Sequence, residues 1–276
     1  MELPEEPTQN DAQAILKNTI EELSNQPIGN LKNSKKGHHP LRKAQMTILT
    51  SVIGPAYQVS PEFFIILICK QVSLSCRYGN FINSAFAYTA LGSILKTYTD
   101  DIELAYKFGQ LGLEIHKIAG VKEYEAKMYC PYYSMIHHSK NHLNETLDYL
   151  VIGYKSGLET GDYEFAGYNL VFYCCNLFLV GNSLEAIKEE LFQYVEAVNA
   201  IRQISSATYI AIFLQAILNL QGKTPSCCRL VGEIYDEDKM APLHSEQRDN
   251  AAILFANALK SMLCFLFERY EEAIFH

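Results

Sequence analysis

The chain has 276 residues, and 49% of them are hydrophobic, which is enough for a substantial core in one large domain or two small ones. Thirty-one acidic residues against 23 basic residues give a formal net charge of −8, which repels phosphate backbones and argues against nucleic-acid binding. No run of 18 residues is free of polar side chains, and the N-terminus has no secretory leader. We therefore expect a soluble cytoplasmic protein with no membrane insertion.

The eight cysteines occur within helical patterns or as adjacent pairs, and no Cys-x-x-Cys spacing is present. This usage predicts reduced thiols, most of which act as small core side chains, rather than disulfides or metal ligands.

Apolar residues recur at three and four positions through most of the chain, whereas strand-like alternation is nowhere sustained, so the sequence predicts an all-α protein. Thr8 or Asn10 is expected to cap a first helix that ends at about Ser24. A polar loop should cover residues 25–39. The second helix is expected to begin at Pro40 and to end near Gly54-Pro55.

Ser60-Pro61-Glu62 is a strong helix start, because serine caps, proline fits the first turn and glutamate favours the positive helix end. This helix should end at Gly79. Pro131 predicts a kink inside a later helix. Further helices are expected over residues 83–98, 101–118, 121–139, 143–160, 163–181, 184–203, 206–221 and 247–267, with another beginning near Tyr270.

The joint at Gly161-Asp162 shows how successive helices connect. Gly161 can adopt the left-handed conformation that ends one helix, and Asp162 can accept hydrogen bonds from the first N–H groups of the next. Glycines inside helical patterns are expected to allow close helix packing; they are Gly109, Gly112, Gly153, Gly157 and Gly167.

A repeat appears where a small residue follows an acidic residue at Ala105, Thr146, Ala186 and Ala273, with spacings of 41, 40 and 87 residues. A period near 40 predicts an α-solenoid of tetratricopeptide-like antiparallel helix pairs, in which the small residues let helices approach closely. The doubled spacing suggests that one pair has lost its second helix. The chain is therefore expected to be a single repeat domain over residues 1–276, with regular pairs over 40–221, an irregular segment over 222–245 and a truncated last pair over 246–276.

His137, His138 and His142 form the sharpest candidate for chemistry. His138 and His142 are four residues apart, which is metal-ligand spacing if the helix runs through Asn141. The alternative is a polar helix end, where histidines meet the last carbonyl groups. Neither a phosphate-binding glycine loop nor a kinase catalytic loop is present, so we expect no cofactor, no ATP hydrolysis and no autophosphorylation.

Four segments carry a resemblance to a known family, and they are the runs Tyr78–Tyr88, Ala105–Leu111, His142–Tyr168 and Gly232–Met240. They resemble, in order and spacing, the helical region of large bacterial, notably cyanobacterial, signalling proteins. Those proteins join a serine/threonine protein kinase, an AAA/STAND-type ATPase, a GAF sensor and often a histidine kinase. The resemblance covers essentially the whole chain from Leu3 onward, and it departs from the family pattern at Ser139, where an aromatic residue is common.

The resemblance implies a noncatalytic interaction or signal-relay scaffold, because this region of the family carries no recognised catalytic residues. Its partners would be the kinase, ATPase, GAF or histidine kinase modules of the same system, and the chain would be a fragment of such a protein. Two alternatives remain open. One is a metal-dependent or hydrolytic enzyme built around His137, His138, His142 and Cys130, and the other is a stand-alone peptide-binding adaptor.

If tetratricopeptide geometry holds, the first helix of each pair faces a concave surface where partners bind. Tyrosine suits such a groove, because it combines a large area with a polar tip. The expected contact set, for which core packing is the alternative role, is Tyr88, Tyr132, Tyr133, His137, Tyr168 and Tyr173. At the C-terminal end, Leu263, Phe267 and Ile274 are expected to be partly exposed and to favour self-association.

Overall fold

The computed structural model describes residues 6–24, 27–99 and 101–276. Leu3 to Glu5, where the resemblance begins, and Asn25 and Gln26, where the predicted loop begins, lie outside the described residues. The described residues form helices and no β-strand, apart from two isolated bridges. By its internal contacts the chain separates into two compact units, Met1–His142 and Leu143–His276. The expected single repeat domain stays a prediction.

The helices of the N-terminal unit are α1 (Gln9–Ser24), α2 (Ile28–Leu31), α3 (Pro40–Ser51), α4 (Ile53–Val59), α5 (Pro61–Tyr78), α6 (Ser84–Tyr98), α7 (Ile102–Ala119) and α8 (Glu125–Pro131). A 3₁₀ turn (Lys122–Tyr124) precedes α8, and a π-helical turn (Tyr132–Ile136) and a second 3₁₀ turn (His137–Ser139) follow it. The helix thus changes type directly after Pro131, where the sequence predicts a kink and where proline supplies no N–H group.

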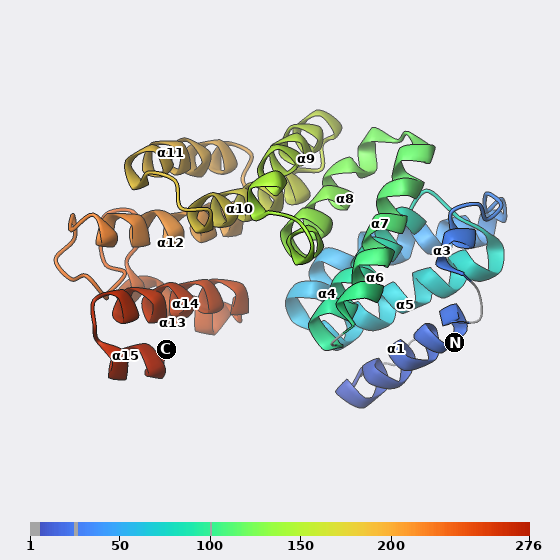
Figure 1. The fold of residues 1–276 in the computed structure, drawn as a ribbon, viewed down its shortest axis with the longest axis horizontal. Coiled ribbons are helices and arrows are strands. Elements are labelled where there is room, and N and C mark those ends of the chain that lie inside the picture. Colours follow the sequence, from blue (N-terminus) through green and yellow to red (C-terminus); the bar gives the residue numbers. More distant parts are fainter. Residues whose placement is uncertain (1–5, 25–26, 100) are drawn as a thin grey trace. The chain divides into compact units, whose positions relative to one another are not determined.

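Helix α6 is the centre of the N-terminal unit, and Figure 1 shows it beside α5 and α7. Every residue from Ser84 to Leu95 is buried. A helix made of small and apolar residues on all sides requires neighbours on all sides. They are α5, α7, α8 and the π-helical turn. A second cluster of buried side chains joins α3, α4 and α5 around Met46, Leu67 and Leu74.

Glycine lets α6 and α7 approach closely. A Cβ atom at Gly92 would lie 2.7 Å from the Ala105 carbonyl oxygen, and one at Gly112 would lie 2.6 Å from the Ala85 carbonyl oxygen. Added carbons at Gly109, Gly153, Gly157 and Gly167 would likewise come within 3 Å of other atoms. The expected packing role of these glycines is therefore confirmed.

The C-terminal unit contains α9 (Thr146–Thr160), α10 (Tyr163–Leu179), α11 (Leu184–Ala200), α12 (Ile204–Leu220), α13 (Glu237–Gln247), α14 (Asn250–Leu266) and α15 (Tyr270–Phe275). A 3₁₀ turn (Leu143–Glu145) leads into α9. Helix α12 is central, with α10, α11 and α14 packed against it, while α9 packs on α10 and both α13 and α15 pack on α14.

The predicted helix ends are confirmed where a capping residue sets them. The Ser60 hydroxyl accepts a hydrogen bond from the Phe63 N–H (3.2 Å) at the start of α5. Gly161, at φ 78°, ends α9, and the Asp162 carboxylate accepts from the Phe165 N–H (3.5 Å) to begin α10. Gly79 likewise ends α5.

Three expectations are wrong. The loop predicted over residues 25–39 contains α2, and the segment 222–245 contains the start of α13, which Asp236 caps. The second predicted helix ends at Ser51 and a new helix begins at Ile53, so that Pro55 lies in the first turn of α4. Proline is tolerated there because the first-turn N–H groups have no partner within the helix.

The small residues of the sequence repeat do not share one environment. Ala105 and Thr146 are buried, as close helix packing requires. Ala186 is exposed and Ala273 is half-buried. The repeated small residue therefore lies in a packed helix contact at the first two positions. Ala186 is exposed, so close helix packing does not explain the small residue there.

None of the described helices is long and apolar enough to cross a membrane. All eight cysteines are free, and five of them are buried, namely Cys69, Cys130, Cys174, Cys228 and Cys264. This agrees with the expected role of most cysteines as small core side chains.

Candidate functional site

The expected tyrosines of the N-terminal unit are core residues. Tyr88 has no exposed surface, its ring stacks on Phe108, and its hydroxyl donates to the Asn80 side-chain oxygen (3.3 Å). Tyr132 and Tyr133 are 1% and 5% exposed, and their rings lie 4.9 Å apart. Rings buried this deeply fit the core-packing role, since they cannot reach a partner unless the unit opens.

His137 is half-buried and completes an aromatic cluster with two of these rings. Its ring centroid lies 5.6 Å from that of Tyr132 and 5.2 Å from that of Tyr133. Gln110 on α7 donates to the Tyr132 hydroxyl (2.6 Å), which ties the π-helical turn to α7. The structure thus brings Tyr132, Tyr133 and His137 together. Their rings pack on one another, and the π-helical turn that carries the two tyrosines packs on α6 and α7.

Tyr168 and Tyr173 belong to the C-terminal unit, on α10. The Tyr173 hydroxyl donates to Glu190 on α11 (2.6 Å), and the burial of this ring, together with Glu190, raises the Tyr173 pKa. Tyr168 is half-buried and donates to Glu164 on its own helix (3.2 Å). Tyr168 and His137 are therefore the members of the expected contact set that keep appreciable surface, and partner binding by the set stays a prediction.

The histidine pair lies at a helix end. The 3₁₀ turn ends at Ser139, so no helix runs through Asn141 to place His138 and His142 on one face. The Lys96 ammonium donates to the Met135 carbonyl (2.5 Å) and lies 2.8 Å from His138 Nε2. Partial burial and then the Lys96 charge lower the His138 pKa, which favours the neutral ring.

A metal site at these residues is not assembled. Among the described residues, no group of three or more histidine, cysteine, aspartate or glutamate side chains is arranged to hold a metal ion. Cys130 is buried on α8 and lies in the core of the N-terminal unit.

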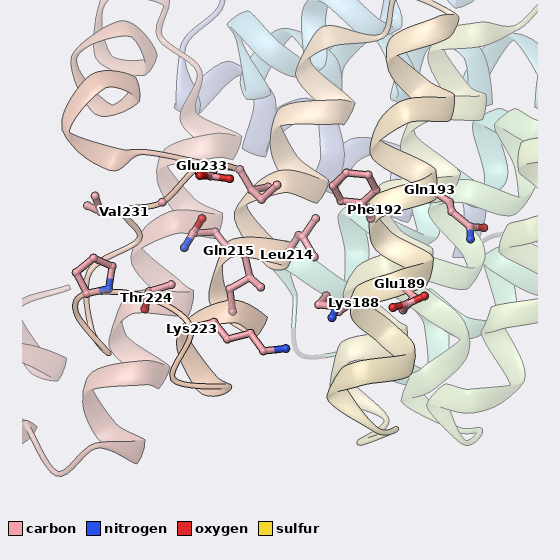
Figure 2. Close-up of a pocket in the computed structure, with 14 residues that line it drawn as sticks. Lys188, Glu189, Phe192, Gln193, Leu214, Gln215, Lys223, Thr224, Val231 and Glu233 are labelled. Carbon is pink, nitrogen blue, oxygen red and sulfur yellow. The ribbon is translucent and has the colours of Figure 1, made fainter.

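One pocket of the C-terminal unit was not assigned from the sequence. It has a volume of about 780 Å³ and lies between α11, α12 and the residues that link α12 to α13. We call these residues, 221–236, the connecting segment. Most of them belong to the segment 222–245 that the sequence marks as irregular, so that composition was a usable signal for the pocket. Figure 2 shows the lining side chains.

Two buried amides hold the connecting segment against α12. The Asn219 side-chain amide lies within hydrogen-bond distance of the carbonyl oxygens of Ser226, Cys227 and Arg229, at 3.2, 3.2 and 2.7 Å. Gln215, which lines the pocket, donates to the Asn219 side-chain oxygen (3.1 Å). Because both amides are fully buried and paired, they fix the path of the segment rather than leave it loose.

The backbone of the segment also packs on Gln215. The Tyr235 N–H donates to Gln215 Oε1 (3.4 Å), and the Gly232 N–H donates to the Tyr235 carbonyl (2.9 Å). A Cβ atom at Gly232 would lie 2.6 Å from Gln215 Oε1, so a larger residue here would displace the Gln215 amide. The pocket therefore has one rigid wall, made by α12 and the segment.

The other wall is α11, and the pocket is amphipathic. Phe192 on α11 is 49% exposed although its ring faces the pocket across from Leu214, which is buried. Figure 2 shows Lys188 and Lys223 extending into the same space from opposite walls, with Glu233 at the other end. An apolar middle with charged ends suits binding, and no nucleophile with an adjacent base lines the pocket.

The two lysines share one counter-ion. Glu185, at the start of α11, forms an ion pair with Lys188 and another with Lys223, whose nitrogen lies 3.3 Å from Glu185 Oε2. The Gln221 amide also donates to Glu185 (2.9 Å). Glu189 follows Lys188 on α11 and also lines the pocket, so two ammonium groups lie among two carboxylates at this end.

Comparisons with protein-family models, curated proteins and solved structures gave no match.

Proposed function

We propose that this chain is a noncatalytic protein-interaction scaffold, built as an α-solenoid of tetratricopeptide-like helix pairs. The packing in the C-terminal unit supports a repeat, because α10, α12 and α14, the first helices of consecutive pairs, pack one on the next. In such arrays each pair buries its apolar face on its neighbours and leaves surfaces for partners.

The observation that carries this proposal is the pocket beside the connecting segment. A half-exposed aromatic ring, a buried apolar floor and charged ends are the features of a surface that binds a peptide or protein. The buried amides Gln215 and Asn219 preorganise its wall, and preorganisation lowers the entropic cost of binding.

The partners we propose are protein modules of one signalling system, namely a protein kinase, an ATPase, a GAF sensor or a histidine kinase. The resemblance of the segments Tyr78–Tyr88 and Gly232–Met240 to the helical region of such proteins supports this choice. A relay region needs no catalytic residues of its own, because it acts by holding or releasing its neighbours.

The test is a binding titration between the purified chain and each of these modules, prepared from signalling proteins of the same genome. Isothermal titration calorimetry should detect saturable binding to at least one module. The chain alone should neither hydrolyse ATP nor phosphorylate itself. An absence of binding to all four modules would refute the partner assignment, and an ATPase activity abolished by a point substitution in this chain would refute the noncatalytic role.

A further inference from the structure

Residues 23–61 carry positive charge and no negative charge. The sequence has five basic residues and two histidines in this stretch and no aspartate or glutamate, although the whole chain is acidic. The flanking carboxylates are offset by other groups. Glu22 pairs with Arg77 (2.6 Å), and Glu62 lies in the first turn of α5, at the positive end of that helix. The stretch therefore presents an excess of positive charge on the N-terminal unit.

Three lysines carry this excess to the surface. Lys35, Lys36 and Lys43 are exposed, and within the described part of the chain they form no ion pair. Lys32 differs from them, because its ammonium pairs with Glu114 on α7 (3.4 Å). The charge that is open to a partner is thus that of the other three lysines.

The loop that carries two of these lysines is fixed on the N-terminal unit. The Asn80 N–H donates to the Lys35 carbonyl (2.9 Å), and the Gly37 N–H donates to the Asn80 carbonyl (2.9 Å). The Asn80 side-chain amide also donates to the Leu31 carbonyl (2.7 Å). These bonds hold Lys35 and Lys36 just before the start of α3.

The first turn of α3 adds to the positive charge. Arg42 and Lys43 are the third and fourth residues of this helix, and its first turn has no acidic residue. The free N–H groups of a helix N-terminus favour anions, so basic residues there do not stabilise the helix itself. Helix stability therefore does not explain the basic residues, whereas attraction of an anionic surface does.

The outer side of α3 is apolar as well as basic. Leu41 and Ile48 are 59% and 64% exposed, and their spacing of seven residues places them on one side of the helix, with the exposed Ala44 between them. The opposite side of α3 packs into the unit through Met46 and Leu49. An exposed apolar strip beside lysines is the pattern of a helix that lies on a membrane surface.

We propose that the outer side of α3, together with the three lysines, docks on an anionic lipid bilayer. The lysines approach the acidic headgroups, and Leu41 and Ile48 enter the headgroup region, where their apolar surface leaves water. A bilayer accepts side chains that protrude from a helix, whereas a protein partner would need a groove shaped for them. The acidic remainder of the chain does not prevent docking, because charges farther than about 8 Å are largely screened at physiological ionic strength.

Co-sedimentation of the full chain with lipid vesicles tests this docking. The chain should bind vesicles that contain phosphatidylglycerol beside phosphatidylcholine, it should not bind vesicles of phosphatidylcholine alone, and binding should weaken as salt is raised. Lys35→Gln/Lys36→Gln/Lys43→Gln should lower the partition coefficient by about tenfold or more. Leu41→Ser/Ile48→Ser should lower it too, because less apolar surface is then covered.

A tryptophan reporter tests whether α3 itself meets the lipid. The chain contains no tryptophan, so Ile48→Trp introduces a single one. Its emission should shift to shorter wavelength when anionic vesicles are added, and brominated lipids should quench it. Leu254→Trp, at a 66% exposed position on α14, is the matched control and should show neither effect.

Matched variants separate this face from the rest of the surface. Lys107→Gln/Lys155→Gln/Arg202→Gln removes three exposed basic charges elsewhere and gives the same net charge as the triple lysine variant, so it should bind like the wild type. Phe265→Ser/Ile274→Ser should also bind like the wild type. Circular dichroism and melting temperature verify the fold of each variant, and the glutamine substitutions affect only exposed side chains.

Four results would overturn the inference. They are no binding to anionic vesicles, equal binding to neutral vesicles, a loss of binding that is the same in the control variants, and vesicle binding without a change in the emission of Ile48→Trp. Tighter binding of labelled poly-L-glutamate or of duplex DNA than of vesicles would make this face a site for that polymer instead. Docking does not depend on the signalling modules proposed above, so each of these results leaves the scaffold function to its own titrations.

Discussion

At the scale of single residues, glycine sets the distance between α6 and α7. A Cβ atom at Gly92 would lie 2.7 Å from the Ala105 carbonyl oxygen and 3.0 Å from the Gly109 nitrogen. Both neighbours are backbone atoms, so they cannot move aside by a change of rotamer. We predict that Gly92→Ala destabilises the fold by about 1–3 kcal/mol in urea denaturation, despite the higher helix propensity of alanine.

Gly29 supplies the control for this prediction. It lies in the short helix α2, and an added Cβ would meet nothing within 4 Å. Gly29→Ala should therefore change stability by no more than about 0.5 kcal/mol. Equal effects of the two substitutions would show that the close approach of α6 and α7 is not what Gly92 provides.

Buried thiols make stability depend on pH above neutrality. Cys69 on α5 has no exposed surface, and burial raises its pKa to about 11. The folded thiol keeps its proton at pH values where the unfolded chain loses it. The contribution of Cys69 to stability is therefore complete below about pH 9 and is lost as pH rises from 9 to 11, by up to about 1.4 kcal/mol per pH unit.

Denaturation curves measured between pH 8 and 10.5 test whether the free energy of unfolding falls as the pH rises. The stability of Cys69→Ala should fall less steeply with pH than that of the wild type. Val72→Ala, in the same helix and also fully buried, should lower stability at every pH and leave the slope unchanged. A wild-type slope that Cys69→Ala fails to reduce would contradict the assignment.

At the scale of elements, the connecting segment depends on one side chain. Asn219 lies within hydrogen-bond distance of three carbonyl oxygens of the segment, and it accepts from Gln215. We predict that Asn219→Ala costs about 1–3 kcal/mol, because it removes these contacts to the segment and leaves the buried Gln215 amide without its acceptor. Hydrogen exchange of residues 226–235 should also become faster. The control is Asn199→Ala, at an exposed position on α11, which should affect neither.

Sequence reasoning succeeded for helices whose ends are set by local chemistry. Ser60, Gly161 and Asp162 each act within a few residues, so their roles could be recognised without knowledge of the fold. It failed at Pro55, because proline is compatible with the first turn of a helix as well as with an end. It also missed α13, whose capping Asp236 lies in a stretch that polar residues and proline made look irregular.

The candidate site was harder to predict than the helices. Whether a tyrosine packs in the core or is free to contact a partner depends on neighbours that are distant in sequence. The Tyr132–Gln110 and Tyr173–Glu190 hydrogen bonds are examples. The pocket likewise arises from contacts between α12 and the connecting segment. Only its position could have been inferred, from the irregular composition of the residues that follow α12.

At the scale of the whole molecule, one group of exposed apolar side chains lies on α14 and α15. Phe265 and Ile274 are 62% and 87% exposed, and together with Tyr270 they line a hollow of about 550 Å³. Of the three residues expected to be exposed at this end, Phe267 and Ile274 are exposed, whereas Leu263 is fully buried against its neighbours. Phe265, Tyr270 and Ile274 line one hollow and so form a patch rather than isolated side chains, and such patches favour association.

We predict that the purified chain self-associates through this patch. Sedimentation velocity at increasing concentrations should show a shift from monomer to a larger species, because pairing two patches removes apolar surface from water. Phe265→Ser/Ile274→Ser should restore the monomer with little change in melting temperature, since both side chains are already largely exposed. Val59→Ser, at an 83% exposed position in the N-terminal unit, is the matched control and should leave association unchanged. A chain that stays monomeric at all concentrations, or a double variant that associates like the wild type, would rule out this surface as the contact.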